Sequence, residues 1–236
     1  MDNTGKLYLI PTRLGDQPPL EVLPLSIRKT VTDINHFIVE NEKVARRFIK
    51  KIVPSKSQNK LEISLLNKFT QDIEIPEFLK PCSEGNDVGL MTDAGCPGIA
   101  DPGAKVVSFA HSQNIKVIPL VGPSSIILAL MASGLNGQNF AFNGYLPIDK
   151  SDCKKRIKQL EKQAGQDNQS QIFIETPYRN EQLFETFLKI LKPQTQLCVA
   201  VDLTLDTEFI KTKTIAEWQT ETSDWHKRPA IFIFQP

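Results

Sequence analysis

Clustered metal ligands are missing from this sequence of 236 residues, which has only three histidines and four cysteines. The histidines are scattered, and no two cysteines are close enough for a CxxC pair or a zinc-ribbon spacing. The cysteines are Cys82, Cys96, Cys153 and Cys198. Because structural metal sites use clustered ligands, we expect no metal in this protein.

Long apolar runs and an excess of one charge are also missing. No stretch approaches the ~20 apolar residues that span a bilayer, so we expect no membrane segment. Met1–Lys6 lacks the basic flank and apolar core of a signal peptide, and scattered cysteines are typical of reduced thiols, so we expect a cytoplasmic protein. The 28 Lys and Arg residues balance 27 Asp and Glu, which argues against a dedicated, strongly basic nucleic-acid binder and leaves room only for local basic faces.

Short apolar segments alternate with amphipathic segments along the chain, which is typical of an α/β fold. In the first half we expect strands at Leu7–Ile10, His36–Glu40, Glu62–Leu66, Asp87–Thr92 and Lys116–Val121, and helices at Leu25–Val31, Glu42–Ile52, Ile75–Cys82 and Ala104–Gln113. In the second half we expect helices at Ser124–Ser133, Lys154–Ala164 and Asn180–Leu191, and strands at Phe140–Tyr145, Ile172–Thr176, Gln196–Asp202 and Ala230–Phe234, with a hairpin-like pair around Thr207–Thr214. The order predicts a mostly parallel sheet and then a mixed sheet, in two domains, 1–118 and 119–236.

Three loops rich in glycine or proline follow predicted strands, at Pro11–Gly15, Thr92–Gly103 and Gly122–Ser125. Ligands of open α/β sheets bind outside the carboxyl ends of the strands, so these loops are the candidate site, although each could also be an ordinary turn. Asp93 could accept hydrogen bonds from ribose hydroxyls or a ligand amine, or it could cap a helix. The loops contain neither GxGxxG nor a Walker A motif, which favours a ligand with few or no phosphates.

Six segments in register resemble motifs of the tetrapyrrole methylase superfamily of S-adenosylmethionine-dependent methyltransferases. They are LYLIPTRLGD (7–16), IVENEK (38–43), TDAGCPGIADPG (92–103), VGPSS (121–125), NGYLP (143–147) and FIETPYR (173–179). Within the superfamily they look most like the branch that methylates a ribose 2′-hydroxyl of a cytidine in small-subunit ribosomal RNA.

The resemblance implies two α/β domains with S-adenosylmethionine in a cleft between them, and a homodimer. Carried over residue by residue, it assigns the cofactor to Ile10 or Pro11, Asp93, Ala94, Gly95, Ser124 and Ser125.

The substrate loops depart from the branch pattern, since Glu40 is followed by Asn41-Glu42-Lys43 instead of Asp-Thr-Arg. Arg13 and Asp16 also replace the usual residues of the opening loop. Ribosomal RNA or the small ribosomal subunit is the expected partner. A tetrapyrrole or another small molecule as the acceptor, or a catalytically silent S-adenosylmethionine-binding protein, are the alternatives.

Three residues are candidates for roles toward the substrate. Glu40, at a predicted strand end, is the candidate catalytic base, or it is an ordinary surface glutamate. Arg179 is a candidate for binding a substrate phosphate, or it forms a structural ion pair. Tyr178 is a candidate for stacking on a base, or it packs at the rim. Basic stretches at Lys43–Lys51 and Lys154–Lys158 either contact RNA phosphates or are solvated faces.

Overall fold

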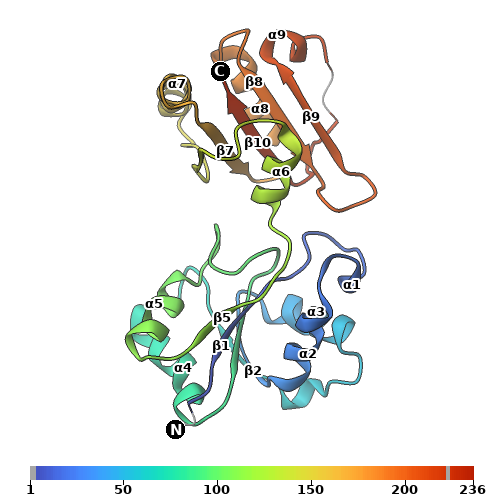
Figure 1. Ribbon diagram of the computed structural model, residues 1–236, viewed down its shortest axis with the longest axis vertical. Coiled ribbons are helices and arrows are strands. Elements are labelled where there is room, and N and C mark those ends of the chain that lie inside the picture. The colour runs from blue at the N-terminus through green and yellow to red at the C-terminus, as the bar shows by residue number, and fades with distance from the viewer. Residues whose placement is uncertain (1–3, 222–223) are drawn as a thin grey trace. The chain divides into compact units, whose positions relative to one another are not determined.

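The computed structural model describes residues 4–221 and 224–236. The chain divides into two compact units, Met1–Ser124 and Ser125–Pro236, which are treated separately (Figure 1). The predicted domain boundary between residues 118 and 119 falls inside strand β5 (Val117–Pro119) of the first unit. None of the helices in the described residues is long and apolar enough to cross a membrane.

The first unit is built on a five-stranded parallel sheet in the order β3-β2-β4-β1-β5. β1 is Leu7–Ile10, β2 is His36–Val39, β3 is Glu62–Leu65 and β4 is Val88–Met91. Every residue of β4 is buried, as expected of a short apolar strand with helices on both faces. Because all five strands run the same way, the loops that follow them leave the sheet at one edge.

Helices cover both faces of this sheet. One core cluster joins β1 and β2 to α2 (Leu25–Asp33) and α3 (Glu42–Ile52), and the other joins the sheet to α4 (Ile75–Ser83) and α5 (Ala104–Ser112). α3 buries Ala45, Phe48, Ile49 and Ile52, the i, i+3, i+4, i+7 stripe of an amphipathic helix. Shorter elements are α1 (Pro19–Val22) and the 3₁₀ turns at Gln58–Lys60 and Asp72–Glu74.

The second unit is built on a mixed sheet in the order β6-β7-β10-β8-β9. Its strands are β6 (Phe140–Phe142), β7 (Ser170–Glu175), β8 (Gln196–Val201), β9 (Phe209–Thr214) and β10 (Ala230–Gln235). Only β6 and β7 pair in parallel. The helices are α6 (Ser125–Ser133), α7 (Lys150–Asp167), α8 (Asn180–Ile190) and α9 (Ile215–Trp218).

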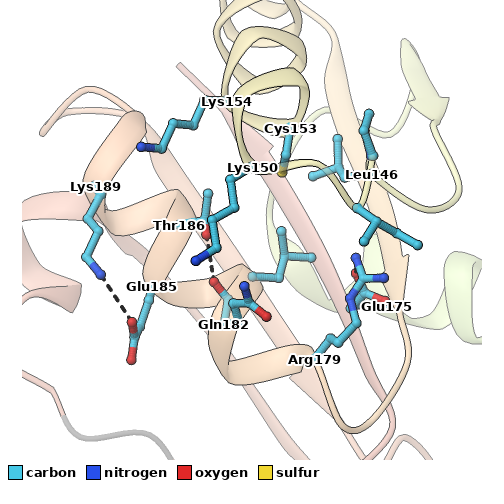
Figure 2. A pocket seen from close by; sticks show the side chains of 13 residues that line it. Leu146, Lys150, Cys153, Lys154, Glu175, Arg179, Gln182, Glu185, Thr186 and Lys189 are labelled. Carbon is cyan, nitrogen blue, oxygen red and sulfur yellow. Dashed lines mark hydrogen bonds and ion pairs between the residues drawn. The ribbon is translucent and has the colours of Figure 1, made fainter.

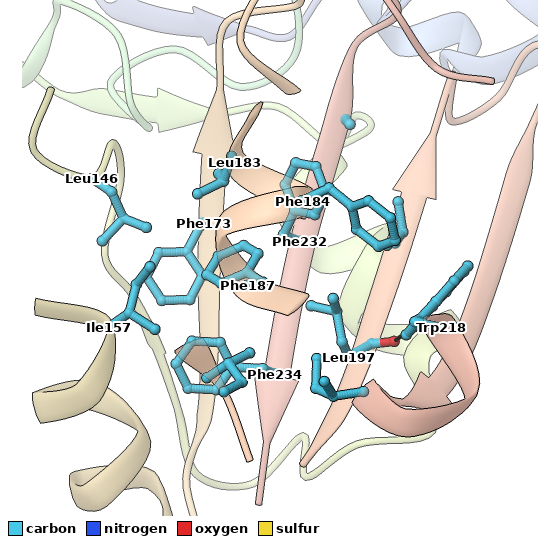
Figure 3. Packing of buried hydrophobic residues seen from close by; sticks show 14 of the residues in the cluster. Leu146, Ile157, Phe173, Leu183, Phe184, Phe187, Leu197, Trp218, Phe232 and Phe234 are labelled. Carbon is cyan, nitrogen blue, oxygen red and sulfur yellow. Dashed lines mark hydrogen bonds between the residues drawn. The ribbon is translucent and has the colours of Figure 1, made fainter. Parts of the chain in front are cut away.

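Aromatic rings dominate the core of the second unit (Figure 3). Phe173 of β7 and Phe234 of β10 stack with ring centroids 5.2 Å apart, and Phe187 of α8 packs edge-on against Phe234. Trp218 is 1% exposed, and its indole N–H donates to the Leu197 carbonyl over 2.8 Å. A wholly buried indole therefore keeps its hydrogen bond, which avoids the cost of an unsatisfied donor.

The predicted α/β class, the mostly parallel first sheet and the mixed second sheet are confirmed. The hairpin-like pair predicted around Thr207–Thr214 is wrong, because this segment contains one strand, β9, whose antiparallel partner is β8. Helix α7 begins at Lys150 instead of Lys154, since the Asp149 side chain caps it by accepting bonds from the backbone N–H groups of Ser151 and Asp152. The short helices α1 and α9 were not predicted.

Candidate active site

The three loops chosen from the sequence meet at the carboxyl edge of the first sheet. The Thr12 backbone N–H donates to the Gly95 carbonyl over 2.9 Å, and the Thr12 hydroxyl donates to the Thr92 carbonyl over 3.2 Å. The Cys96 thiol donates to the Pro123 carbonyl over 3.3 Å. The loops after β1, β4 and β5 are thus bonded to one another, although more than 100 residues separate the first from the last.

Close backbone approach at this edge depends on glycine. Gly95 has φ +80°, a conformation that residues with a side chain rarely adopt. A Cβ atom at Gly122 would lie 2.2 Å from the Cβ of Pro11, so the loop after β5 can rest on the loop after β1 only without a side chain there. Ile10 is wholly buried in the core, and Pro11 is buried beneath Gly122.

A cavity of about 200 Å³ lies beside these turns in the first unit. Its lining comes from the opening loop, from one face of α3 and from the end of β4: Thr12, Arg13, Leu14, Gly15, Val44, Ala45, Arg47, Phe48, Met91, Thr92, Asp93 and Ala94. Asp93 and Ala94 are exposed, whereas Gly95 behind them is buried. The Asp93 turn therefore forms part of the cavity wall and presents a carboxylate at the surface.

Glu40 lies at the same edge, directly after β2. Its carboxylate accepts a hydrogen bond from the Asp93 backbone N–H over 3.3 Å. Burial is the main cause that raises the pKa of Glu40 from 4.5 to about 7, and the negative charges of Asp101 and Asp93 raise it further. The hydrogen bond from the Asp93 N–H acts in the opposite direction and lowers this pKa. At neutral pH the Glu40 carboxyl is thus close to half ionised, a state suited to accepting a proton.

Asp93 and Asp101 share this partly dry environment. Burial raises the pKa of both carboxyl groups, and the charge of Asp93 adds to the rise at Asp101. Three carboxyl groups that repel one another and are short of water form a site that a cation would stabilise. Within the described residues, no group of three His, Cys, Asp or Glu side chains is arranged to hold a metal ion.

Ion pairs and hydrogen bonds hold the opening loop in place. They involve Arg13 and Asp16, two positions at which the sequence departs from the branch that it resembles. Arg13 donates to the Gln17 carbonyl and to the Asp16 carboxylate, and Lys51 at the end of α3 donates to Asp16 over 2.9 Å. Both cations hold the pKa of Asp16 below its ordinary value. Arg13 and Asp16 therefore act within the loop, which ties it to α3.

The remaining predicted residues lie elsewhere. Ser124 is the last residue of the first unit, and Ser125 begins α6 in the second. Arg179, at the start of α8, forms an ion pair with Glu175 over 2.8 Å, and the Glu175 side chain is 1% exposed. Of the two alternatives for Arg179, the ion pair is therefore present. Tyr178 is 74% exposed, with the Lys227 ammonium 5.8 Å from its ring centroid.

Sequence reasoning included Thr12 only as part of a candidate loop and Arg47 only as part of a basic stretch, and it missed Val44 and Phe48 of the α3 wall. Thr12 acts through bonds to residues 80 or more positions away, and no local pattern signals such a bond. The α3 wall carries a weak signal, because the helix follows Glu40 directly and its amphipathic pattern leaves Arg47 off the buried stripe.

No family model matches the chain. "Ribosomal RNA small subunit methyltransferase I" of Buchnera aphidicola subsp. Schizaphis graminum is 29% identical to it over 236 residues, covering 99% of this chain and 79% of that protein. The protein of the same name from Bacillus subtilis is 29% identical over 225 residues, covering 92% of this chain and 71% of that protein. The crystal structure of the methyltransferase CobJ has a TM-score of 0.65 and 12% identity, covering 98% of this chain and 94% of that chain, a likeness of fold alone.

These findings confirm the resemblance drawn from the motifs, first at the level of the class: the fold is similar to that of solved methyltransferases such as CobJ and cobalt precorrin-4 methyltransferase. At the level of the branch, the chain is similar along nearly its whole length to small-subunit ribosomal RNA methyltransferase I proteins.

Replacing Gly122 with alanine tests the packing of the loops. The new Cβ would overlap Pro11, so we expect Gly122→Ala to lower the free energy of unfolding by about 1–3 kcal/mol, the range for overpacking. Chemical denaturation measures this change. Gly137→Ala is the control, because a Cβ there meets nothing within 4 Å and Gly137 has no positive φ. Equal stability of the two variants would contradict the contact.

Replacing Glu40 with glutamine tests its raised pKa. The folded state holds the Glu40 proton more tightly than the unfolded state does, so ionisation of Glu40 lowers stability as pH rises through about 7. We expect Glu40→Gln to stabilise the protein at pH 8 by about 1–2 kcal/mol after allowance for solvent screening. The gain should vanish below pH 4.5, where the carboxyl is protonated in both states. Glu84→Gln, whose exposed side chain has no hydrogen bond or ion pair within the described ranges, should show no such pH dependence. A gain independent of pH would contradict the assignment.

Proposed function

We propose that this chain is an S-adenosylmethionine-dependent methyltransferase that methylates a ribose 2′-hydroxyl in small-subunit ribosomal RNA. The observation that carries the proposal is the convergence of the Pro11, Asp93 and Gly122 loops with Glu40 at one sheet edge. Each of these segments belongs to a motif of the resemblance. The similarity along 92–99% of this chain to proteins named for ribosomal RNA methylation supports the choice of substrate.

The residues at this edge fit the cofactor. When bound, S-adenosylmethionine supplies a methyl group on a positively charged sulfur, which is already an activated electrophile. The carboxylates of Glu40, Asp93 and Asp101 complement that charge, and small residues such as Ala94 and Gly95 let backbone groups approach a ligand. A cavity of about 200 Å³ accepts a part of such a ligand, because whole-ligand sites are about 300–1,000 Å³. We assign Pro11 and the backbone of Ile10 to the floor of the cofactor site. We assign Ser124 and Ser125 to further contacts with the cofactor.

Glu40 is the proposed catalytic base. With S-adenosylmethionine bound as the methyl donor, the Glu40 carboxylate would accept the proton of the ribose hydroxyl that takes the methyl group, which would leave Glu40 protonated. The Asp93 N–H fixes the carboxylate at the mouth of the site, so the chain contributes both alignment and a proton acceptor.

The substrate side of the proposal rests on local basic surface, since the net charge is only +1. Arg47 lines the cavity of the first unit, and its guanidinium has no hydrogen bond or ion pair with any described residue, so it is available for a phosphate. Tyr178 is exposed enough to stack on a base. We further propose a cytoplasmic homodimer. Met131, 74% exposed, is the kind of apolar surface that a second copy would cover.

A ribose-methylation map of ribosomal RNA tests the function. We expect one 2′-O-methyl mark on small-subunit RNA to disappear in a strain that lacks this chain and to return when the chain is restored. Calorimetry with S-adenosylhomocysteine, run in parallel, tests the cofactor alone. Binding together with an unchanged map would contradict the RNA substrate and favour a small-molecule acceptor or a silent cofactor-binding protein. No binding would contradict the methyltransferase itself.

Turnover of Glu40→Gln tests the base. The value of kcat/KM for the cofactor reports groups of the free enzyme, and we expect it to rise with pH through an apparent pKa of about 7. In Glu40→Gln we expect that rise to disappear and kcat to fall about 10²- to 10⁴-fold, the usual contribution of a general base. The control Glu84→Gln should keep the wild-type profile. Unchanged kcat in Glu40→Gln, with the RNA substrate and saturating cofactor, would remove Glu40 from the mechanism.

A further inference from the structure

A second cavity, of about 540 Å³, lies in the second unit where β7 ends and α7 and α8 begin (Figure 2). Six of the residues that line it carry the argument: Lys150, Cys153 and Lys154 of α7, and Arg179, Thr186 and Lys189 near or on α8. Four of these six side chains are cationic. The cavity belongs wholly to the second unit and contains none of the residues assigned to the methyl donor.

The charges in this cavity are only partly neutralised. Glu175, 1% exposed, is held by Arg179 and by the Thr176 backbone N–H over 2.7 Å. Glu185 pairs with Lys189 over 3.1 Å. Two lysines of α7 are different, because the side chains of Lys150 and Lys154 make no hydrogen bond or ion pair with any residue in the described ranges. The carboxylates that face the cavity are thus already engaged, and two positive charges are left over.

The two unpaired lysines are four residues apart on one helix, so their side chains lie on the same face. Figure 2 shows Lys150 reaching from α7 toward Gln182 and Thr186 of α8, with Lys154 one turn further along α7. Like charges at this spacing repel each other, and an anion between them would relieve that repulsion. The first N–H groups of α7 are not the binding element, since Asp149 already accepts from Ser151 and Asp152.

We propose that this cavity binds a phosphate group, held by the ammonium groups of Lys150 and Lys154. The Thr186 hydroxyl donates to the Gln182 carbonyl over 2.7 Å and can still accept a bond. Leu146, Ile148 and Leu183 supply an apolar wall for the sugar or base attached to the phosphate. Two sources share this chemistry: a backbone phosphate of RNA and the phosphate of a free sugar phosphate.

The RNA source is the one we infer, and it rests on the proposed function. Phosphate contacts position a nucleic acid without reading its sequence, and a chain with a net charge of +1 has to make them at local sites such as this one. The cavity would hold a phosphate at some distance along the strand from the methylated ribose. Lys150 and Lys154 are positioning residues in this account, and Arg179 shapes the wall through its bond to Glu175.

The test compares two double variants of the full chain. The cavity variant, Lys150→Gln with Lys154→Gln, removes both unpaired charges. The control variant, Lys162→Gln with Lys192→Gln, removes the same amount of charge from two exposed lysines of the second unit that do not line the cavity. Fluorescence anisotropy with a 12-nucleotide single-stranded RNA gives the affinity at several salt concentrations. We expect the cavity variant to bind about tenfold more weakly, with a slope of log K against log salt smaller by about 1.4, the value for two lost phosphate contacts on a single strand. The control should match the wild type.

Alkylation of Cys153, followed by mass spectrometry of its peptide, locates the ligand, because the Cys153 thiol lines the cavity. We expect the RNA to slow this alkylation in the wild type and in the control variant but not in the cavity variant. Ribose 5-phosphate is the second probe, and protection by it without protection by RNA would assign the cavity to a free sugar phosphate. Protection by neither probe, or equal loss of RNA affinity in both variants, would overturn the proposal.

Calorimetry with S-adenosylhomocysteine separates this inference from the proposed function. The cavity variant should bind S-adenosylhomocysteine as the wild type does, because Lys150 and Lys154 take no part in that site. One outcome would separate the two proposals: the wild type binds S-adenosylhomocysteine, does not bind the 12-nucleotide RNA, and has its Cys153 protected by ribose 5-phosphate. That outcome would contradict the RNA substrate and support the phosphate site.

Discussion

The hydrogen bond from the Thr12 N–H to the Gly95 carbonyl is the constraint on which the candidate site depends. It joins the loop after β1 to the loop after β4, and the contact of Pro11 with Gly122 adds the loop after β5. Once these loops are fixed, the Asp93 N–H points at Glu40, which follows the neighbouring strand β2. A parallel sheet makes this possible, because all of its strands deliver their loops to one edge. The role of the first unit is thus to hold backbone groups and three carboxyl groups in a small, partly dry space.

That arrangement works against stability. Burial raises the pKa of Glu40, Asp93 and Asp101, and repulsion from neighbouring carboxylates adds to the rise at Glu40 and Asp101. Ionising these groups is therefore less favourable in the folded state than in the unfolded state, which lowers the free energy of unfolding. The same features make the edge suitable for a cationic ligand and make Glu40 a proton acceptor near neutral pH. Compensation comes from elsewhere, in the apolar clusters on both faces of the first sheet and the aromatic core of the second. Groups with perturbed pKa values collect at functional sites for this reason.

Local patterns were enough to predict most of the elements and the edge at which the site lies. Helix α3 could be bounded at Glu42–Ile52 because its apolar stripe has helical spacing and Asn41 caps it. The partner of β9 could not be predicted, since a half-buried strand of mixed polar and apolar residues does not specify which other strand it pairs with. The same holds for the bond of Thr12 to Gly95, which joins positions far apart in the sequence that only the fold brings together. Sequence therefore indicated the candidate loops, and the structure was needed to show how these loops hold one another.

The central claim is that these turns of the first unit contact the methyl donor. Amide hydrogen exchange with and without saturating S-adenosylhomocysteine tests it most directly, because each turn gives its own peptides. The account predicts slower exchange within 11–17, 92–103 and 120–125, and no change in strand β9. Binding of S-adenosylhomocysteine that leaves the exchange of all three turns unchanged, or that slows exchange only in other segments, would contradict it.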